Sequence, residues 1–103
     1  MIYIGRVHQS KDSCINVYIG RGSPLGNPWP INSKQSRDAV CDRYDTYLRK
    51  AVKDKESAQY KEMARLYLLL KAGASINLQC FCTPNRCHGE TIKAILESAL
   101  ARS

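Results

Sequence analysis

The chain has 103 residues, of which 44% are hydrophobic and 24% are charged, and it carries a formal net charge of +7. This length supports one hydrophobic core rather than two, and no apolar run approaches the ~18 residues of a membrane span. The first residues lack the basic and apolar regions of a secretory signal, so a cytoplasmic location is expected. Thiols stay reduced there, and a disulfide framework among the five cysteines is not expected.

Two short strands and a proline-rich loop are predicted in the N-terminal third. Residues 2–4 and 15–19 are rich in β-branched and aromatic side chains, and each run is followed by Gly-Arg, which predicts strands. Residues 22–33 hold three of the four prolines, which exclude a helix interior and a central strand. An ordered loop or a lid is therefore expected after the second strand.

Three helices and one strand are predicted in the remainder of the chain. Apolar residues at helical spacing predict a helix over about 36–53 with Ser36 as its N-cap, and a second over about 57–71 that Gly73 ends. Residues 75–82 alternate as a strand does, and an amphipathic helix runs from about residue 90 to the C-terminus. Together, these strands and helices predict a single α/β domain over residues 1–103. Its helices pack on a short, mostly parallel sheet of three to four strands, Rossmann-like in outline.

The segment Cys80-Phe-Cys-Thr-Pro-Asn-Arg-Cys-His-Gly-Glu90 gathers three thiols and an imidazole at the junction of the last strand and helix. Residues two apart in a strand point to the same side, so Cys80 and Cys82 are expected on one face. Cys80 lies deepest in the strand and is interpreted as a core residue. Three interpretations of the segment as a whole are open.

The first interpretation is a catalytic or ligand-binding turn. Backbone N–H groups at a helix N-terminus bind anions, and the helix dipole lowers the pKa of a cysteine placed there. The candidate catalytic residues are Cys87, His88 and Glu90. The candidate ligand- or phosphate-binding residues in this segment are Cys82, Arg86 and Gly89.

The second and third interpretations are a zinc site and a purely structural turn. Cys80, Cys82, Cys87 and His88 offer three thiolates and a nitrogen, a set that suits tetrahedral zinc. The adjacent Cys87 and His88, however, cannot easily bind one ion with relaxed geometry. In the structural interpretation the cysteines are packed and His88 is satisfied by a carbonyl group. No cofactor is expected, and zinc is the alternative.

A second candidate region is Gly20-Arg-Gly-Ser-Pro-Leu-Gly-Asn-Pro-Trp29, which is rich in glycine but lacks the Gly-Lys-Ser/Thr ending of a P-loop. Arg21, Asn27 and Trp29 supply a guanidinium, an amide and an indole, the groups that nucleotide and nucleobase sites use. The alternative, of equal weight, is that Trp29 anchors the loop to the core while Asn27 caps a turn.

Several segments together carry a family resemblance. They are Tyr18–Arg21, Gly26–Trp29, Arg37 with Ala39, Tyr44–Leu48 and Leu78–Glu90. In this order, over about residues 15–100, they resemble the DUF4326 family of bacteria and their phages. The most specific part is the signature Cys-aromatic-Cys-x-Pro-x-x-Cys-His-Gly-acid. The segment from Cys80 is also similar, more weakly, to the DUF488 family, where it likewise precedes a helix.

The resemblance implies a compact α/β domain but no settled reaction. The positions that the family pattern features are Arg21, Asn27, Cys82, Cys87, His88 and Glu90. For a phage-encoded member, the resemblance implies the host cytoplasm and a role in modifying or evading the host. Whether the domain is an enzyme is left open by the resemblance.

The leading functional hypothesis is a nucleotide- or nucleic-acid-directed ligand-binding domain or enzyme. Its pocket would form between residues 20–29 and 82–90 at the carboxyl ends of the strands. Arg21 and Arg86 would hold phosphate, and Trp29 would stack on a base. The alternative is a non-enzymatic basic module for nucleic acid or a host protein, with or without zinc. The net positive charge favours an anionic partner in both cases, and no membrane partner is expected.

Overall fold

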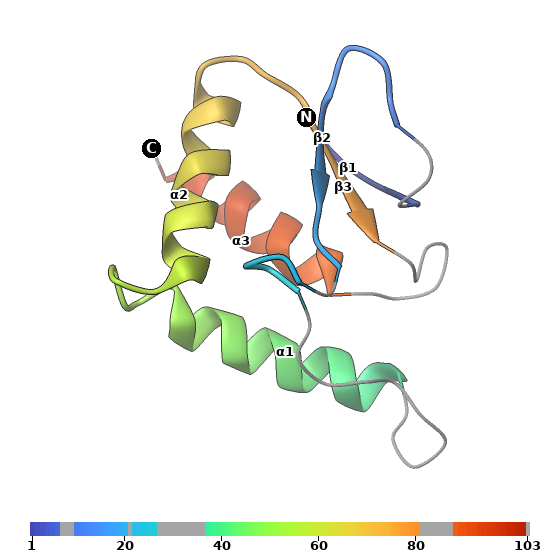
Figure 1. Ribbon diagram of the computed structural model, residues 1–103. Helices are drawn as coiled ribbons and strands as arrows, with labels where there is room; N and C mark the ends of the chain where they lie inside the picture. The colour runs from blue at the N-terminus through green and yellow to red at the C-terminus, as the bar shows by residue number, and fades with distance from the viewer. Residues whose placement is uncertain (7–9, 21, 27–36, 81–87, 103) are drawn as a thin grey trace.

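The computed structural model describes residues 1–6, 10–20, 22–26, 37–80 and 88–102. Within these residues, strands and helices follow the order β, β, α, α, β, α along the chain (Figure 1). The elements are β1 (Ile2–Arg6), β2 (Ile15–Tyr18), α1 (Arg37–Ala51), α2 (Ala58–Lys71), β3 (Ile76–Cys80) and α3 (Gly89–Ala101). The predicted α/β class and the predicted kinds of element are confirmed, and the bounds differ from the expected ones by a few residues.

The described sheet has three strands in the order β1-β3-β2, and both neighbouring pairs are parallel. In the register, Ile4 and Val17 flank Leu78 from the two sides. All five residues of β3 are buried, as is usual for the inner strand of a parallel sheet. Because the three strands point the same way, their carboxyl ends lie at one edge of the sheet.

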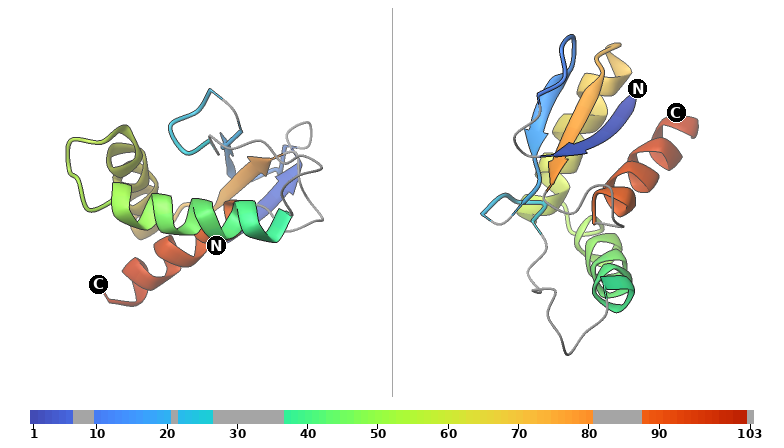
Figure 2. Two further views of the ribbon diagram at one scale, coloured as in Figure 1. Left: turned by 90° about the horizontal axis from the view of Figure 1, so that it is seen from below. Right: turned by 90° about the vertical axis from the view of Figure 1, so that its right-hand side faces the viewer.

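The helices are placed unevenly around this sheet. Helices α2 and α3 pack on one face, whereas residues 10–14 lie on the side opposite α2 (Figure 1). Helix α1 crosses the molecule beyond the carboxyl ends of the strands, as the view from below shows (Figure 2). The hydrophobic core fills the space between the sheet and the helices. Its buried members include Val17, Ile19, Leu25, Tyr44, Leu48, Leu66, Ile76, Leu78, Cys80, Ile92 and Leu96.

Local sequence explains where the helices begin and which sides they bury. Val40, Tyr44 and Leu48, four residues apart, are fully buried and form the inner stripe of α1. The Oγ atom of Ser57 accepts a hydrogen bond from the Tyr60 N–H at 3.0 Å, which caps α2. This cap was not predicted. Ser36, the predicted cap of the first helix, lies outside the described residues.

Helix α2 ends as the sequence predicted. Gly73 follows the C-cap residue Ala72 and has a φ of +102°, a conformation that favours glycine. No helix in the described ranges is long and apolar enough to cross a membrane.

Candidate functional site

The carboxyl edge of the sheet brings together three separate parts of the chain. Strand β2 leads into residues 19–26, α3 begins just after residue 88, and α1 runs across this edge (Figures 1 and 2). In parallel α/β sheets, ligands bind outside the carboxyl ends of the strands. The carboxyl edge of the sheet is therefore the first candidate for a ligand-binding site.

His88 connects these parts. It is the N-cap residue of α3, with helical φ and ψ of −61° and −18°, and its side chain makes no capping hydrogen bond. The residue is only 6% exposed, and its Nε2 lies 2.5 Å from the carbonyl oxygen of Ile19. A carbonyl oxygen only accepts hydrogen bonds, so Nε2 carries the proton and donates it. The bond joins the start of α3 to the residue that follows β2.

The surroundings of His88 decide its charge. Burial lowers the pKa of its imidazole below the ordinary value of 6.5, and the hydrogen bond to the Ile19 carbonyl opposes this effect only in part. The ring is therefore neutral near pH 7. With the proton on Nε2, Nδ1 is the nitrogen that can accept a proton or a hydrogen bond.

Tyr44 of α1 completes the connection. Its ring meets the His88 ring edge to face, with centroids 5.0 Å apart and an interplanar angle of 73°. Its hydroxyl group donates a 2.7 Å hydrogen bond to the carbonyl oxygen of Leu25, which is 1% exposed. One buried phenol thus contacts both the segment after β2 and the N-cap residue of α3.

The segment after β2 is a pair of tight turns. The Ser23 N–H donates to the Gly20 carbonyl oxygen at 3.1 Å, and the Gly26 N–H donates to the Ser23 carbonyl oxygen at 3.0 Å. A Cβ atom on Gly26 would lie 2.5 Å from the Gly20 carbonyl oxygen, so this contact leaves no room for a side chain. The buried side chain of Leu25 anchors these turns to the core. The segment therefore has a defined position at the carboxyl edge of the sheet.

A polar contact holds α3 against α1 next to His88. The Thr91 hydroxyl donates to Asp45 Oδ2 at 3.2 Å, and Arg49 Nε donates to Asp45 Oδ1 at 2.7 Å. Asp45 therefore lies between a hydroxyl and a guanidinium. The relative position of the two helices at this edge is set partly by this carboxylate.

The predicted site residues divide into those described and those not. His88 is buried and bound to a carbonyl, as the structural interpretation of the turn expects. Gly89 is buried, Glu90 is exposed, and Cys80 is fully buried in the core. The predicted site residues that lie outside the described residues are Arg21, Asn27, Trp29, Cys82, Arg86 and Cys87.

The zinc interpretation also depends on residues that lie outside the described ranges. Among the described residues, no three His, Cys, Asp or Glu side chains are grouped so that they could hold a metal ion. Two of the four predicted ligands, Cys82 and Cys87, lie outside those residues. The zinc prediction therefore stays a prediction.

The sequence reasoning did not assign a role at the site to Tyr44, Asp45 or Thr91. Tyr44 carries a signal that could have been used, because a tyrosine on the buried face of a helix needs a partner for its hydroxyl group. Asp45 and Thr91 carry no such signal, since nothing in the sequence indicates that these two polar residues on different helices meet.

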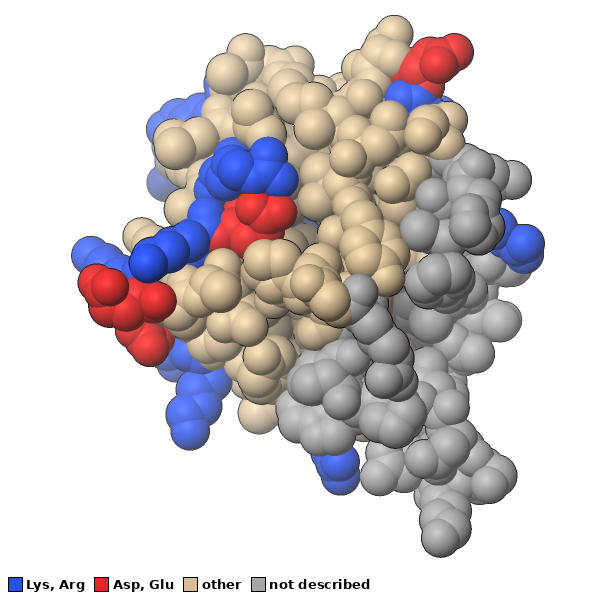
Figure 3. All heavy atoms as spheres, viewed as in Figure 1, with Lys and Arg blue, Asp and Glu red and all other residues tan. Residues whose placement is uncertain are grey.

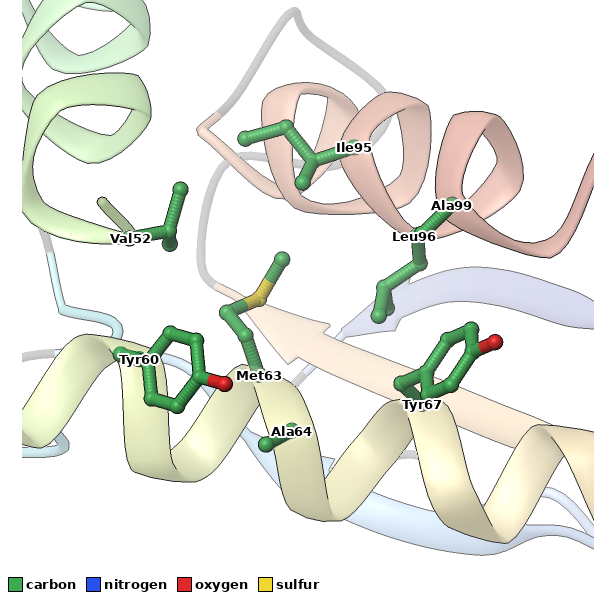
Figure 4. Close-up of a pocket in the computed structure, with 8 residues that line it drawn as sticks. All are labelled: Val52, Tyr60, Met63, Ala64, Tyr67, Ile95, Leu96 and Ala99. Atoms are coloured by element: carbon green, nitrogen blue, oxygen red, sulfur yellow. The ribbon is translucent and has the colours of Figure 1, made fainter. Parts of the chain in front are cut away.

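An apolar pocket between α2 and α3 is a separate feature. It encloses about 210 Å3, and Figure 4 shows Met63 and Leu96 between the rings of Tyr60 and Tyr67. Its lining is almost wholly nonpolar and includes no titratable group besides the two tyrosines. It is therefore unsuited to the predicted binding of a phosphate.

The fold and this edge define a small α/β domain with a parallel sheet and a buried histidine at the N-cap of its last helix. The model of the family described as "Domain of unknown function (DUF4326)" matches residues 3–98. The chain belongs to this family, and the match begins at residue 3 rather than near residue 15. No curated protein and no solved structure matches the chain.

Proposed function

We propose that the domain binds a nucleotide, or a nucleotide unit of a nucleic acid, at the carboxyl edge of its sheet in the cytoplasm. The observation that carries the proposal is the hydrogen bond from His88 Nε2 to the Ile19 carbonyl. This bond holds the segment after β2 beside the start of α3, and these are the two regions that hold the candidate phosphate- and base-binding residues.

The chemistry of the two regions supports this class of ligand. The N-terminus of α3 carries the positive end of the helix dipole, which favours a phosphate. Arg21 and Arg86 add positive charge in the sequence on each side, and Trp29 offers a flat ring for a base. Gly89 and Cys82 would line the phosphate site, and Asn27 would bind the polar edge of the base.

Any reaction at this edge would involve Cys87, His88 and Glu90. His88 is neutral and its Nε2–H is engaged by Ile19, so proton transfer by this side chain would use Nδ1. Cys87 precedes the helix and would be the nucleophile, because a thiolate is favoured at a helix N-terminus. Glu90 is exposed in the first turn and would act as a base.

The test uses the single tryptophan as a reporter. Native mass spectrometry of freshly purified protein is combined with titrations of ATP, GTP, CTP and UTP, followed by Trp29 fluorescence. We expect a bound nucleotide mass or saturable quenching by at least one nucleotide. Arg21→Ala should weaken binding about tenfold or more, since a lost charge-assisted hydrogen bond costs about 1.5–3 kcal/mol.

Lys55→Ala is the matched control for the charge, because Lys55 is exposed in the turn between α1 and α2. Binding that Arg21→Ala and Lys55→Ala weaken equally, or the absence of both adduct and quenching, would contradict the proposal. Stoichiometric zinc in the mass spectrum would favour the zinc-stabilised alternative.

The alternative function, a basic module for nucleic acid or a host protein, rests on the net charge of +7. On the face shown in Figure 3, Lys and Arg side chains are interspersed with Asp and Glu rather than gathered in one patch. The alternative predicts affinity for an oligonucleotide that falls steeply with salt and survives substitution of Cys87 and His88.

A further inference from the structure

The face of the sheet opposite α2 differs in chemistry from the helix-covered face. The register places side chains on it in two rows across the three strands. The rows are Tyr3, Asn77 and Asn16, then Gly5, Gln79 and Tyr18. Asn77 is 2% exposed and Gln79 is 8% exposed, so two amides are buried in the central strand. Burying an amide costs free energy unless it is hydrogen-bonded, and Asn77 is bonded to Asn16, so this face is a satisfied polar surface.

This polar face is hollowed beside β1. The hollow encloses about 280 Å3, close to the ~300 Å3 at which small-molecule sites begin. Its lining residues are Tyr3, Ile4, Gly5, Ser10, Lys11 and Asn77. They come from β1, β3 and the segment that follows β1 in the chain. The helix-side pocket between α2 and α3, in contrast, is almost wholly apolar.

Hydrogen bonds fix the wall of the hollow to its floor. The Lys11 N–H donates to Asn16 Oδ1 at 2.9 Å, and the same oxygen accepts a hydrogen bond from Asn77 Nδ2 at 2.9 Å. One amide oxygen of β2 therefore ties the backbone at Lys11 to the buried side chain of β3. The wall is held in place before any ligand binds, which reduces the entropy that binding would cost.

The charge of the hollow indicates the kind of ligand. The Lys11 ammonium group lies 4.5 Å from the centroid of the Tyr3 ring, and the side chain is exposed. Ser10 also lines the hollow, and the described residues of the lining include no Asp or Glu. Among the described residues, the lining of the hollow thus supplies a cation and a hydroxyl-bearing side chain but no carboxylate.

We propose that this hollow is a second binding site, for a small organic anion whose phosphate or carboxylate group is held by Lys11 and Ser10 against the Tyr3 ring. The site lies on the sheet face opposite α2. It does not depend on the binding proposed for the carboxyl edge. Asn77 and Gly5 form its floor, and a Cβ atom on Gly5 would lie 3.0 Å from Asn77 Oδ1.

The test is a two-dimensional 15N–1H NMR titration of the full chain with ribose 5-phosphate and, separately, with citrate. We expect saturable shifts of the Tyr3, Gly5, Ser10 and Lys11 amides with at least one probe. A response to ribose 5-phosphate alone assigns the site to phosphates, and a response to citrate alone assigns it to carboxylates. Lys11→Glu should weaken the response at least tenfold.

Two further variants serve as controls for this titration. Lys55→Glu makes the same change in net charge at an exposed position and should leave the affinity unchanged. Ser10→Phe should fill the hollow and also abolish the response, while Ser10 itself is exposed and contributes no core contact. No saturable shift at these amides with either probe, or equal affinity in Lys11→Glu, would overturn the proposal. Trp29 quenching by nucleotides should be unaffected by Lys11→Glu, so the two sites fail or succeed independently.

Discussion

A buried histidine between two segments of the chain is the central residue of the candidate site. The same side chain that the sequence marks as a catalytic candidate also holds the fold together, since its Nε2–H is bound to the Ile19 carbonyl. A general acid or base needs a nitrogen within reach of its substrate, and only Nδ1 remains for this purpose. His88 therefore makes a positioning contact through Nε2, and any catalytic role would fall to Nδ1.

The lowered pKa of His88 makes a prediction about stability and pH. The unfolded chain takes up a proton near pH 6.5, whereas the folded chain keeps the ring neutral to lower pH. Stability is thus highest above pH 6.5 and falls as the pH decreases toward the folded-state pKa. The loss is at most about 1.4 kcal/mol per pH unit. Urea denaturation at pH 7.5, 6.5 and 5.5 measures it.

His88→Gln removes this titration and should flatten the stability between pH 7.5 and 5.5, even though the variant is less stable at pH 7.5. Lys55→Gln, at an exposed position in the turn between α1 and α2, provides the control and should keep the wild-type dependence. Identical pH profiles for wild type and His88→Gln would show that the ring does not titrate abnormally.

At the scale of secondary structure, the two helices on the sheet leave a space between them that neighbouring side chains do not fill. Ala64 and Ala99 face this apolar pocket of about 210 Å3. Alanine at these places keeps the helices regular but buries little area. The pocket is thus a place where stability can be added without touching the carboxyl edge.

Ala99→Leu should stabilise the protein by about 1 kcal/mol, because each buried methylene group contributes up to ~0.8 kcal/mol and part of this is lost to side-chain ordering. For a domain of this size the melting temperature should rise by about 4–8 °C. Ala94→Leu, at an exposed position of the same helix, makes the same change and should leave the melting temperature nearly unchanged. Equal shifts in the two variants would mean that the pocket is not being filled.

At the scale of the whole molecule, β3 is the strand on which the described sheet depends. It pairs with both other described strands, all five of its residues are buried, and it leads toward the turn before α3. Strands β1 and β2, although they precede it in the chain, pair with β3 and not with each other. The sheet therefore forms only when the last strand has joined the first two.

We expect the backbone amides of residues 77–80 to exchange with solvent only through global unfolding. Their free energy of exchange, measured by NMR under native conditions, should equal the free energy of unfolding in urea. Amides in the turn at residues 52–56, which joins α1 and α2, should exchange through smaller openings. Faster exchange in β3 than in the middle of α2 would contradict the central role of this strand.

Much of this arrangement could be predicted from the chain alone. The spacing of Val40, Tyr44 and Leu48 determined the buried side of α1, and Gly73 determined the end of α2, because these signals are local. The alternation from residue 75 onward marked Cys80 as a core residue, which its full burial confirms. These features depend on a few neighbouring residues, and short-range backbone geometry is enough to establish them.

Other features depend on residues far apart in the sequence, and only the tertiary structure decided them. The insertion of β3 between β1 and β2 follows from pairing strands about 60–75 residues apart, which no local pattern encodes. The bond from His88 to Ile19 and the contacts of Tyr44 likewise require the packed edge. Sequence periodicity determines which side chains of each helix or strand are buried. The packing of several helices and strands against one another determines which of these side chains come into contact.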